Sequence, residues 1–247
     1  MNQKPEKLID KKGLRLDGRK ADELRPLKLE VGILSNADGS AYIEHGKNKI
    51  LAGVFGPREV HPKHLALQDR MVLKCRYHMA PFSVQERKSP APSRREVELS
   101  KVIRDCLEPA IFMEYYPRTM TDIFIEVLQA DGGTRCASIT AAALAMADSG
   151  VPMRDLVVAC AAGKADDTIV LDLMDEEDKL GSADVPLAMM PNLNAVTLLQ
   201  MDGILTHDEF ETAVNMAIDG CKKIYAMQKE ALKAKYVSAK EEEEAEE

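Results

Sequence analysis

Several features are missing from this sequence, and each absence argues against a class of protein. No apolar run reaches the length of a membrane span, and the charged segment Met1–Lys12 lacks the apolar stretch of a signal peptide. Neither the Gly-Lys-Ser/Thr loop of nucleotide hydrolases nor the Gly-x-Ser-x-Gly turn of serine hydrolases occurs. We therefore expect a cytoplasmic protein without membrane contact, whose chemistry is neither nucleotide hydrolysis nor serine hydrolysis.

The five cysteines argue against two further kinds of site. They include no Cys-x-x-Cys pair, their spacing suits no metal, and their number is odd. Most stand in apolar segments, where an intracellular chain keeps cysteine as a reduced core residue. We expect five reduced cysteines and no zinc site.

Charge is distributed unevenly along the 247 residues. The net charge is −8, and the glutamates of Glu241–Glu247 contribute −6 of it. Such a block is normally solvated, so we predict a disordered acidic tail over 237–247. A short N-terminal arm over 1–13 and one folded domain over 14–236 make up the rest.

Within the folded part, a basic stretch and an acidic stretch stand apart. Arg58–Arg104 contains 11 Lys/Arg against 5 Asp/Glu, and Ala165–Asp184 contains eight acidic residues and one lysine. The two stretches fit a track for a polyanion that leads to an acidic centre. Two unrelated surface patches would explain the same counts.

Hydrophobic periodicity predicts an α+β fold, with helices packed on mostly antiparallel sheets. Turn signals at Asp38-Gly39 and Gly46-Lys47-Asn48 favour an antiparallel meander at the N-terminal end. The predicted strands of that meander are Leu29–Leu34, Ser40–His45, Lys49–Phe55 and Met71–His78. Later strands are predicted at Ile123–Leu128, Leu156–Ala162, Thr168–Met174, Val185–Met189 and Ala195–Met201.

Helix starts are marked by two capping boxes, Ser93-x-x-Glu96 and Thr206-x-x-Glu209. The first helix should end or kink at Pro109, and the second should run to about Tyr236. Between them, the alanine-rich segment Cys136–Ala147 is a strong helix former.

The pentapeptide Asp131-Gly132-Gly133-Thr134-Arg135 joins a predicted strand to that alanine-rich helix. Its glycines allow the backbone to approach a ligand closely. The free N–H groups of a first helical turn favour an anion, and Arg135 adds a planar donor for phosphate. The pentapeptide therefore predicts a small oxyanion site, although a simple glycine turn with a surface arginine would look the same.

Two further groups could take part in chemistry. Asp178 and Asp184 flank a short connection, where they could converge on one Mg²⁺ or one of them could serve as a general acid. An acidic surface turn is the alternative.

Arg94 and Arg95 open a predicted helix, where side chains of neighbouring residues point about 100° apart. At most one of them should face a given phosphate, and both could simply be solvated.

Taken together, these segments resemble the RNase PH family of phosphorolytic 3′-to-5′ exoribonucleases, and within it the catalytic RNase PH-like subunit of the archaeal exosome. The resemblance begins at Arg15-Leu16-Asp17-Gly18-Arg19 and runs to about Tyr236. Its family motifs are Asn36–Ser40, Pro92–Arg95, Leu128–Arg135, Gly163–Asp166 and the Asp178/Asp184 pair. The exosome-like motifs are His61–His64, Tyr77–Phe82 and Val151–Leu156.

The resemblance implies an RNase PH-like β-α-β-α domain and a role for each candidate residue. Gly133, Thr134 and Arg135 would hold the attacking inorganic phosphate. Asp184 would protonate the leaving 3′-oxygen or help to hold Mg²⁺, with Asp178 as the second metal ligand. The RNA-binding residues would be Arg94, Arg95 and Lys63, the last in a loop that narrows a central pore.

The resemblance also implies partners. This type of chain binds the RNA 3′ end and alternates with an inactive paralogue in a hexameric ring of three heterodimers, capped by RNA-binding subunits. A non-catalytic ring subunit and a stand-alone, tRNA-trimming RNase PH are the alternatives. The chain departs from the family pattern at Ser182 and Thr134, and Pro186 stands where bacterial relatives have a metal-linked lysine.

Overall fold

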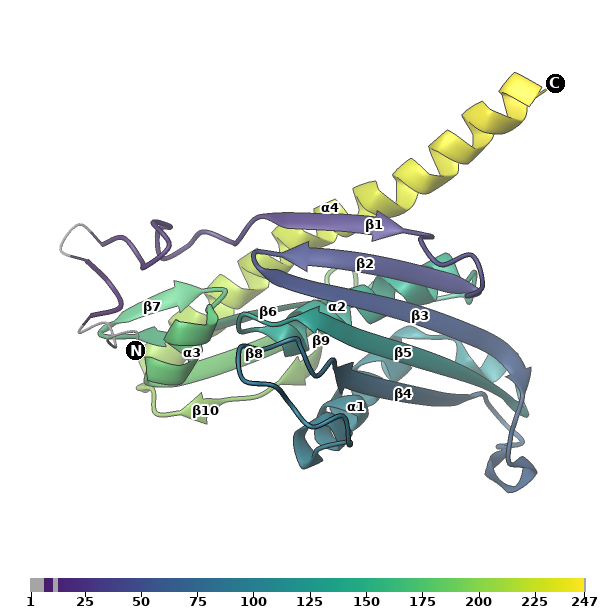
Figure 1. The fold of residues 1–247 in the computed structure, drawn as a ribbon, viewed down its shortest axis with the longest axis horizontal. Coiled ribbons are helices and arrows are strands. Elements are labelled where there is room, and N and C mark those ends of the chain that lie inside the picture. The colour runs from purple at the N-terminus through teal and green to yellow at the C-terminus, as the bar shows by residue number, and fades with distance from the viewer. Residues whose placement is uncertain (1–6, 11–12, 247) are drawn as a thin grey trace.

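The computed structural model describes residues 7–10 and 13–246, with side chains as far as Val237. Two five-stranded sheets enclose a central helix, a second helix lies beside it against the first sheet, and the C-terminal helix covers the outer face of the second sheet (Figure 1). The α+β class predicted from the sequence is confirmed.

The first sheet has the order β1-β2-β3-β5-β4. Its strands are β1 Leu27–Val31, β2 Gly39–His45, β3 Asn48–Glu59, β4 Val72–Met79 and β5 Thr119–Gln129. The first three form the predicted meander, but the prediction that the fourth run continues it is wrong. The strand β5 lies between β3 and β4 and pairs with β4 in parallel. A helical crossover between β4 and β5 makes this parallel pairing possible.

The second sheet has the order β10-β8-β6-β7, with β9 also paired to β8. Its strands are β6 Val158–Ala165, β7 Thr168–Leu171, β8 Ala183–Met190, β9 Ala195–Leu199 and β10 Asp202–Gly203. The predicted hairpin of β6 and β7 is confirmed. The sequence did not predict β10, nor the short helix α3, Asp175–Leu180, that connects β7 to β8.

The helix α1, Arg94–Leu107, begins at the predicted capping box. The Glu96 N–H donates to Ser93 Oγ at 3.2 Å, and the Ser93 N–H donates to Glu96 Oε2 at 2.7 Å. The α-helix ends at Leu107, and the 3-10 turn Glu108–Ala110 follows it. Pro109 has no N–H to donate, so it cannot continue the α-helical hydrogen bonds.

The helix α2, Thr134–Asp148, lies between the two sheets and is buried almost throughout (Figure 1). Small alanine side chains allow the strands on both sides to approach it closely, and they share one hydrophobic core with it. A second cluster, which includes Val158, Leu187, Cys221 and Ile224, fills the space between the second sheet and α4. All five cysteines are free, as predicted.

The helix α4 runs from His207 to Glu246, beyond the predicted end near Tyr236. The backbone of most of the predicted acidic tail is therefore helical. The local reason is composition, because Lys, Glu and Ala are strong helix formers and no Gly or Pro interrupts this stretch. Among the residues that the structure describes, no helix combines the length and the apolar character needed to span a membrane.

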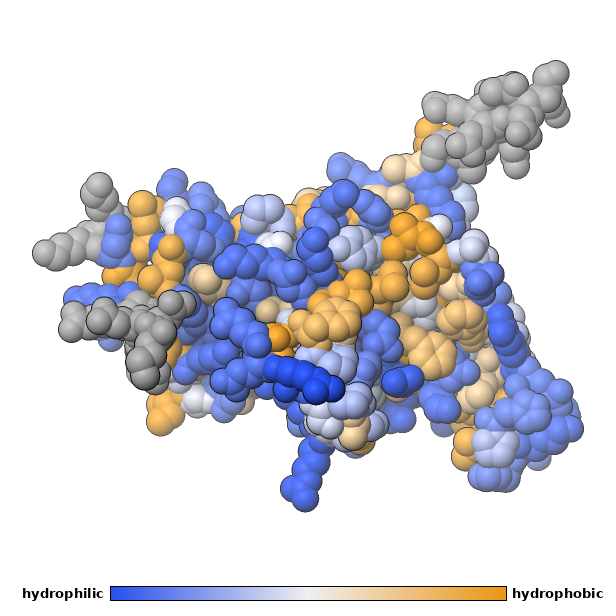
Figure 2. Space-filling view, in the orientation of Figure 1, coloured by the Kyte–Doolittle hydropathy of each residue, from blue (hydrophilic) through white to orange (hydrophobic). Residues whose placement is uncertain are grey.

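The face of the first sheet that is turned away from α2 is open to solvent. Hydrophobic side chains gather on it over β3 and β5 (Figure 2), and the Phe124 side chain is 36% exposed there. Phe55 contacts Phe124 edge-to-face with ring centroids 5.8 Å apart.

Candidate active site

The loop between β5 and α2 has a backbone shape that only glycine adopts readily. Gly132 and Gly133 have φ angles of +73° and +66°. A Cβ atom on Gly132 would lie 2.6 Å from the backbone of Met174 and Asp175 at the start of α3. The first glycine thus allows the loop and α3 to pack backbone against backbone, while Gly133 becomes the N-cap of α2.

The backbone N–H groups in the first turn of α2 are available to a ligand. The N-cap residue Gly133 provides no side chain to accept hydrogen bonds from them. Thr134 Oγ1 accepts a hydrogen bond from the buried Tyr77 hydroxyl at 3.0 Å. Arg135 donates from Nη1 to Gln200 Oε1 at 2.6 Å, but its buried Nε has no partner among the described residues. An unpaired guanidinium N–H beside a helix N-terminus is suited to an anion.

The two predicted carboxylates come from different elements. Asp178 is in the middle of α3, not at the edge of a short connection as predicted, and Asp184 is near the start of β8. Asp184 is paired in register with Asp202 of β10, an acidic neighbour that the sequence analysis missed.

Both carboxyl groups hold protons more tightly than free aspartate does. Burial raises the pKa of Asp184 to about 6, and the nearby charge of Asp178 adds to the shift while Arg135 opposes it. Partial desolvation also raises the pKa of Asp178, and Arg95 opposes that shift. Neither carboxylate makes a hydrogen bond or ion pair with another described residue, so both are available to a proton, a cation or a substrate.

One pocket brings the two halves of the site together. Its polar lining consists of Arg95, Gly133, Thr134, Arg135, Asp178 and Asp184, and its apolar lining of Cys136, Ala161 and Pro186. Six of the eight predicted site residues therefore converge. Arg94 does not line the pocket, in agreement with the expectation that only one of the two adjacent arginines faces it.

Lys63 is not brought to this pocket. It lies in the 3-10 turn Lys63–Leu65 of the loop that follows β3, where its exposed side chain pairs with Glu59 at 3.2 Å. Figure 1 shows this loop at the opposite end of the molecule from α3. Any contact between Lys63 and RNA would therefore be made at a distance from the reacting end.

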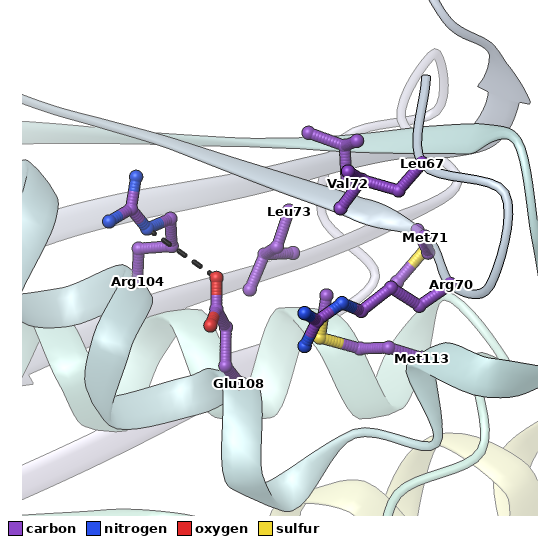
Figure 3. Close-up of a pocket in the computed structure, with 8 residues that line it drawn as sticks. All are labelled: Leu67, Arg70, Met71, Val72, Leu73, Arg104, Glu108 and Met113. Atoms are coloured by element: carbon purple, nitrogen blue, oxygen red, sulfur yellow. Dashed lines mark ion pairs between the residues drawn. The ribbon is translucent and has the colours of Figure 1, made fainter. Parts of the chain in front are cut away.

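A larger cavity of about 250 Å³ lies elsewhere, between β4, the end of α1 and Met113 (Figure 3). Five apolar and three charged side chains line it, and Arg104 Nε pairs with Glu108 Oε1 at 3.5 Å. None of the predicted site residues lines it. It has neither the paired carboxylates nor the helix N-terminus that distinguish the smaller pocket.

Comparison with known proteins agrees with this geometry. Residues 23–152 match the profile of the 3′ exoribonuclease family, domain 1, and residues 155–220 match domain 2. The chain belongs to the RNase PH family of 3′ exoribonucleases. The first profile covers the first sheet, α1 and α2, and the second covers the second sheet and the first part of α4, so the pocket of this exoribonuclease lies where the two family domains meet.

Archaeal relatives are similar over nearly their whole length. The exosome complex component Rrp41 of Thermococcus onnurineus is 66% identical over 241 residues, which is 97% of each chain. The protein of the same name from Pyrococcus abyssi is 64% identical over 244 residues, or 98% of each chain. That of Cenarchaeum symbiosum is 60% identical over 229 residues, or 93% of this chain and 94% of the relative.

Solved structures show the same fold at low sequence identity. The crystal structure of rice Rrp46 has a TM-score of 0.78 at 21% identity, and the match covers 88% of this chain and 100% of that one. A chain of the Archaeoglobus fulgidus exosome with RNA bound to the active site has a TM-score of 0.75 at 23% identity, with 86% and 92% covered. The RNase PH-like fold predicted from the motifs is thereby confirmed.

Proposed function

We propose that this exoribonuclease is a phosphorolytic 3′-to-5′ enzyme and a catalytic subunit of an exosome ring. The observation that carries the proposal is the shared pocket. The N-terminus of α2 and Arg135, whose buried Nε is unpaired among the described residues, line the same pocket as Arg95 and two carboxylates that hold protons tightly. An anion site next to a proton donor is what phosphate-dependent cleavage of a phosphodiester needs.

In the proposed reaction, inorganic phosphate binds at Gly133, Thr134 and Arg135. One of its oxygens attacks the phosphorus of the last phosphodiester of the RNA. The bond from that phosphorus to the 3′-oxygen of the preceding nucleotide breaks, and a nucleoside diphosphate is released from an RNA one residue shorter. Asp184 donates a proton to the leaving 3′-oxygen, a role for which its raised pKa of about 6 suits it.

Arg95 contributes to this reaction by binding the backbone of the RNA 3′ end at the pocket, and Arg94 binds the chain further out. Neutralising phosphate charge next to the reacting bond allows the nucleophile and the RNA, which are both anionic, to occupy one small pocket. Positioning and charge neutralisation then account for most of the rate enhancement.

The carboxylates also fit Mg²⁺. They supply two oxygen donors and repel each other, and Mg²⁺ is commonly held by one or two carboxylates together with substrate phosphates. Among the described residues no set of three or more metal-binding side chains occurs, so substrate oxygens and water would complete the shell. If Asp184 instead acts as a metal ligand, it and Asp178 would hold the ion, which would neutralise phosphate charge when bound.

The proposed partners follow from the relatives, which are named as components of the exosome complex. We propose that the chain alternates with an inactive RNase PH-like paralogue in a hexameric ring of three heterodimers in the cytoplasm, capped by RNA-binding subunits. Lys63, exposed on a loop far from the pocket, would then contact RNA on its way to the site.

The test is an assay with 3′-tailed RNA, Mg²⁺ and inorganic phosphate, on the full chain alone and with its ring partner. We expect nucleoside diphosphate only when phosphate is present, and a loss of at least about 1,000-fold in Asp184→Asn. Asp175→Asn is the matched control, because Asp175 belongs to α3 but its side chain pairs with Lys179 and does not line the pocket. This control should stay within about twofold of the wild type.

Other outcomes would identify the alternatives. Nucleoside monophosphate released without phosphate would indicate a hydrolytic nuclease. RNA binding without any product would identify a non-catalytic ring subunit. Full activity of the chain alone, eluting as a homohexamer in gel filtration, would identify a stand-alone RNase PH.

A further inference from the structure

The loop Asp131–Gly133, called the phosphate loop below after its proposed ligand, is held by side chains that are distant in sequence. Arg25 Nη1 donates to the carbonyl of Asp131 at 2.6 Å and to that of Gly132 at 3.4 Å. Asn48 Nδ2 donates to the Gly132 carbonyl at 2.6 Å, and Asn48 Oδ1 accepts from the Asp131 N–H at 2.6 Å. Two consecutive glycines provide no stiffness of their own, so these contacts define the shape of the loop.

The direction of these bonds bears on anion binding. Neither Arg25 nor Asn48 lines the pocket, so the carbonyls of Asp131 and Gly132 are turned away from it. A carbonyl oxygen facing the pocket would repel phosphate. With both oxygens bound behind the loop, the side that faces the anion is left to the N–H groups at the start of α2 and to Arg135.

Arg25 is itself held rigidly. Asp172 accepts hydrogen bonds from Arg25 Nε at 3.0 Å, from Nη2 at 2.6 Å and from the backbone N–H at 2.8 Å. Both side chains are nearly inaccessible to solvent, at 4% and 5% exposure. His45 Nε2 lies 2.9 Å from the same carboxylate, and the pKa of Asp172 is held well below its ordinary value by His45 and Arg25 despite its burial.

Asp172 also connects the loop to the acidic wall of the pocket. It directly follows β7 and stands three residues before α3, the helix that carries Asp178. The same segment packs backbone against backbone on Gly132. The pair Arg25–Asp172 therefore ties the phosphate loop to the base of the helix that bears one of the two carboxylates.

We propose that Arg25, held by Asp172, is a positioning residue that sets the phosphate loop for binding inorganic phosphate. This inference rests on the proposed phosphorolytic function and deepens it. Arg25 touches neither phosphate nor RNA, and its effect passes through the backbone of Asp131 and Gly132. A purely structural residue would affect phosphate binding, turnover and RNA binding alike, whereas Arg25 should affect phosphate binding alone.

The test uses the full chain, in whichever assembly the wild type releases nucleoside diphosphate. Arg25→Lys keeps the charge but loses the two-pronged geometry, because lysine offers a single ammonium group. We expect its KM for phosphate to rise at least about tenfold, with kcat at saturating phosphate within about threefold and RNA affinity without phosphate within about twofold.

A second measurement does not need turnover. Phosphate alone should raise the Tm of the wild type, and Arg25→Lys should need at least about ten times more phosphate for an equal shift. The matched control is Arg19→Lys, because Arg19 also contacts Asp172, with Nη2 3.2 Å from its carbonyl, but makes no contact with the loop. Its phosphate KM should stay within about twofold of the wild type.

If Arg25→Lys does not fold, Asn48→Ser tests the same loop without a change of charge, and we expect a smaller rise in the phosphate KM. Parallel changes in phosphate KM, kcat and RNA affinity, or an unchanged phosphate KM in both variants, would overturn the inference. A wild type that releases no nucleoside diphosphate would instead refute the proposed function, so the two failures are distinct.

Discussion

The two walls of the pocket differ in how they are held. The phosphate loop is bound by Arg25 and Asn48 on the side away from the pocket, and Thr134 accepts a hydrogen bond from Tyr77. On the other wall, Asp178 and Asp184 make no hydrogen bond or ion pair with any described residue. One wall is thus prepared for its ligand in advance, while the other keeps carboxylates whose charge is unbalanced until a proton, cation or substrate arrives.

The two walls should therefore affect different kinetic quantities. A preformed anion site affects the concentration of phosphate that is needed, whereas the unpaired carboxylates affect the rate of the chemical step. Four measurements test this difference, and they are given in order of decreasing expected effect.

Replacing Arg135 by glutamine should have the largest effect on phosphate use. The variant loses a guanidinium with an unpaired buried Nε in the pocket, so we expect the phosphate KM to rise about 100-fold while RNA affinity changes little. Arg154→Gln, which removes an exposed arginine paired with Glu114, is the control. Should the phosphate KM stay constant while only kcat falls, the assignment of phosphate to this wall would be wrong.

Adding a single methyl group at Gly132 should break the contact between the two walls. Gly132→Ala places Cβ 2.6 Å from the backbone of α3 at a positive φ angle, and we expect a loss of about 3 kcal/mol in the free energy of unfolding. Gly150→Ala is matched in φ, +77°, but its Cβ meets nothing within 4 Å, so it should cost about 1 kcal/mol. Equal losses in urea unfolding would show that the close approach is unimportant.

Removing the unpaired charge of Asp184 should stabilise the fold at neutral pH. Since its pKa is raised to about 6 in the folded chain, the unfolded chain ionises first as pH rises from 4, and the wild type loses stability through pH 6. Asp184→Asn does not titrate. We expect it to be more stable than the wild type by about 1–2 kcal/mol at pH 7.5 and equally stable at pH 4. An advantage that is independent of pH would argue against this origin.

The smallest expected effect is a difference in RNA affinity between variants of the two adjacent arginines. Arg95 lines the pocket and Arg94 does not, so Arg95→Gln should weaken RNA binding in low salt about tenfold and Arg94→Gln about twofold. Fluorescence anisotropy with a labelled RNA measures both. Equal effects would mean that the RNA backbone follows the surface of α1 and does not enter the pocket along Arg95.

Much of the local structure could be predicted because its causes are local. The capping boxes at Ser93 and Thr206 begin helices at those positions, since a side chain and an N–H three residues apart satisfy each other wherever they occur. The pentapeptide before α2 likewise required only a strand, two glycines and a helix former. The candidate residues of the pocket were found from such patterns together with the family resemblance.

The errors concern the relations between segments. A meander was predicted for four strands because alternation shows that a strand exists but not which strand it pairs with. The short α3 was read as a connection, because six residues with four consecutive acids have no hydrophobic period, and its place depends on packing against the phosphate loop.

The amino-acid sequence indicated most of the strands and helices, where two of the helices begin, and which side chains are available for anion and acid chemistry. The three-dimensional packing of the chain brings Arg95, Arg135, Asp178 and Asp184 into one pocket and leaves Lys63 far from it. It alone showed that Arg25 binds Asp172 across 147 residues and supports the phosphate loop. The reason is that such contacts depend on how two sheets pack around α2, which no short stretch of sequence encodes.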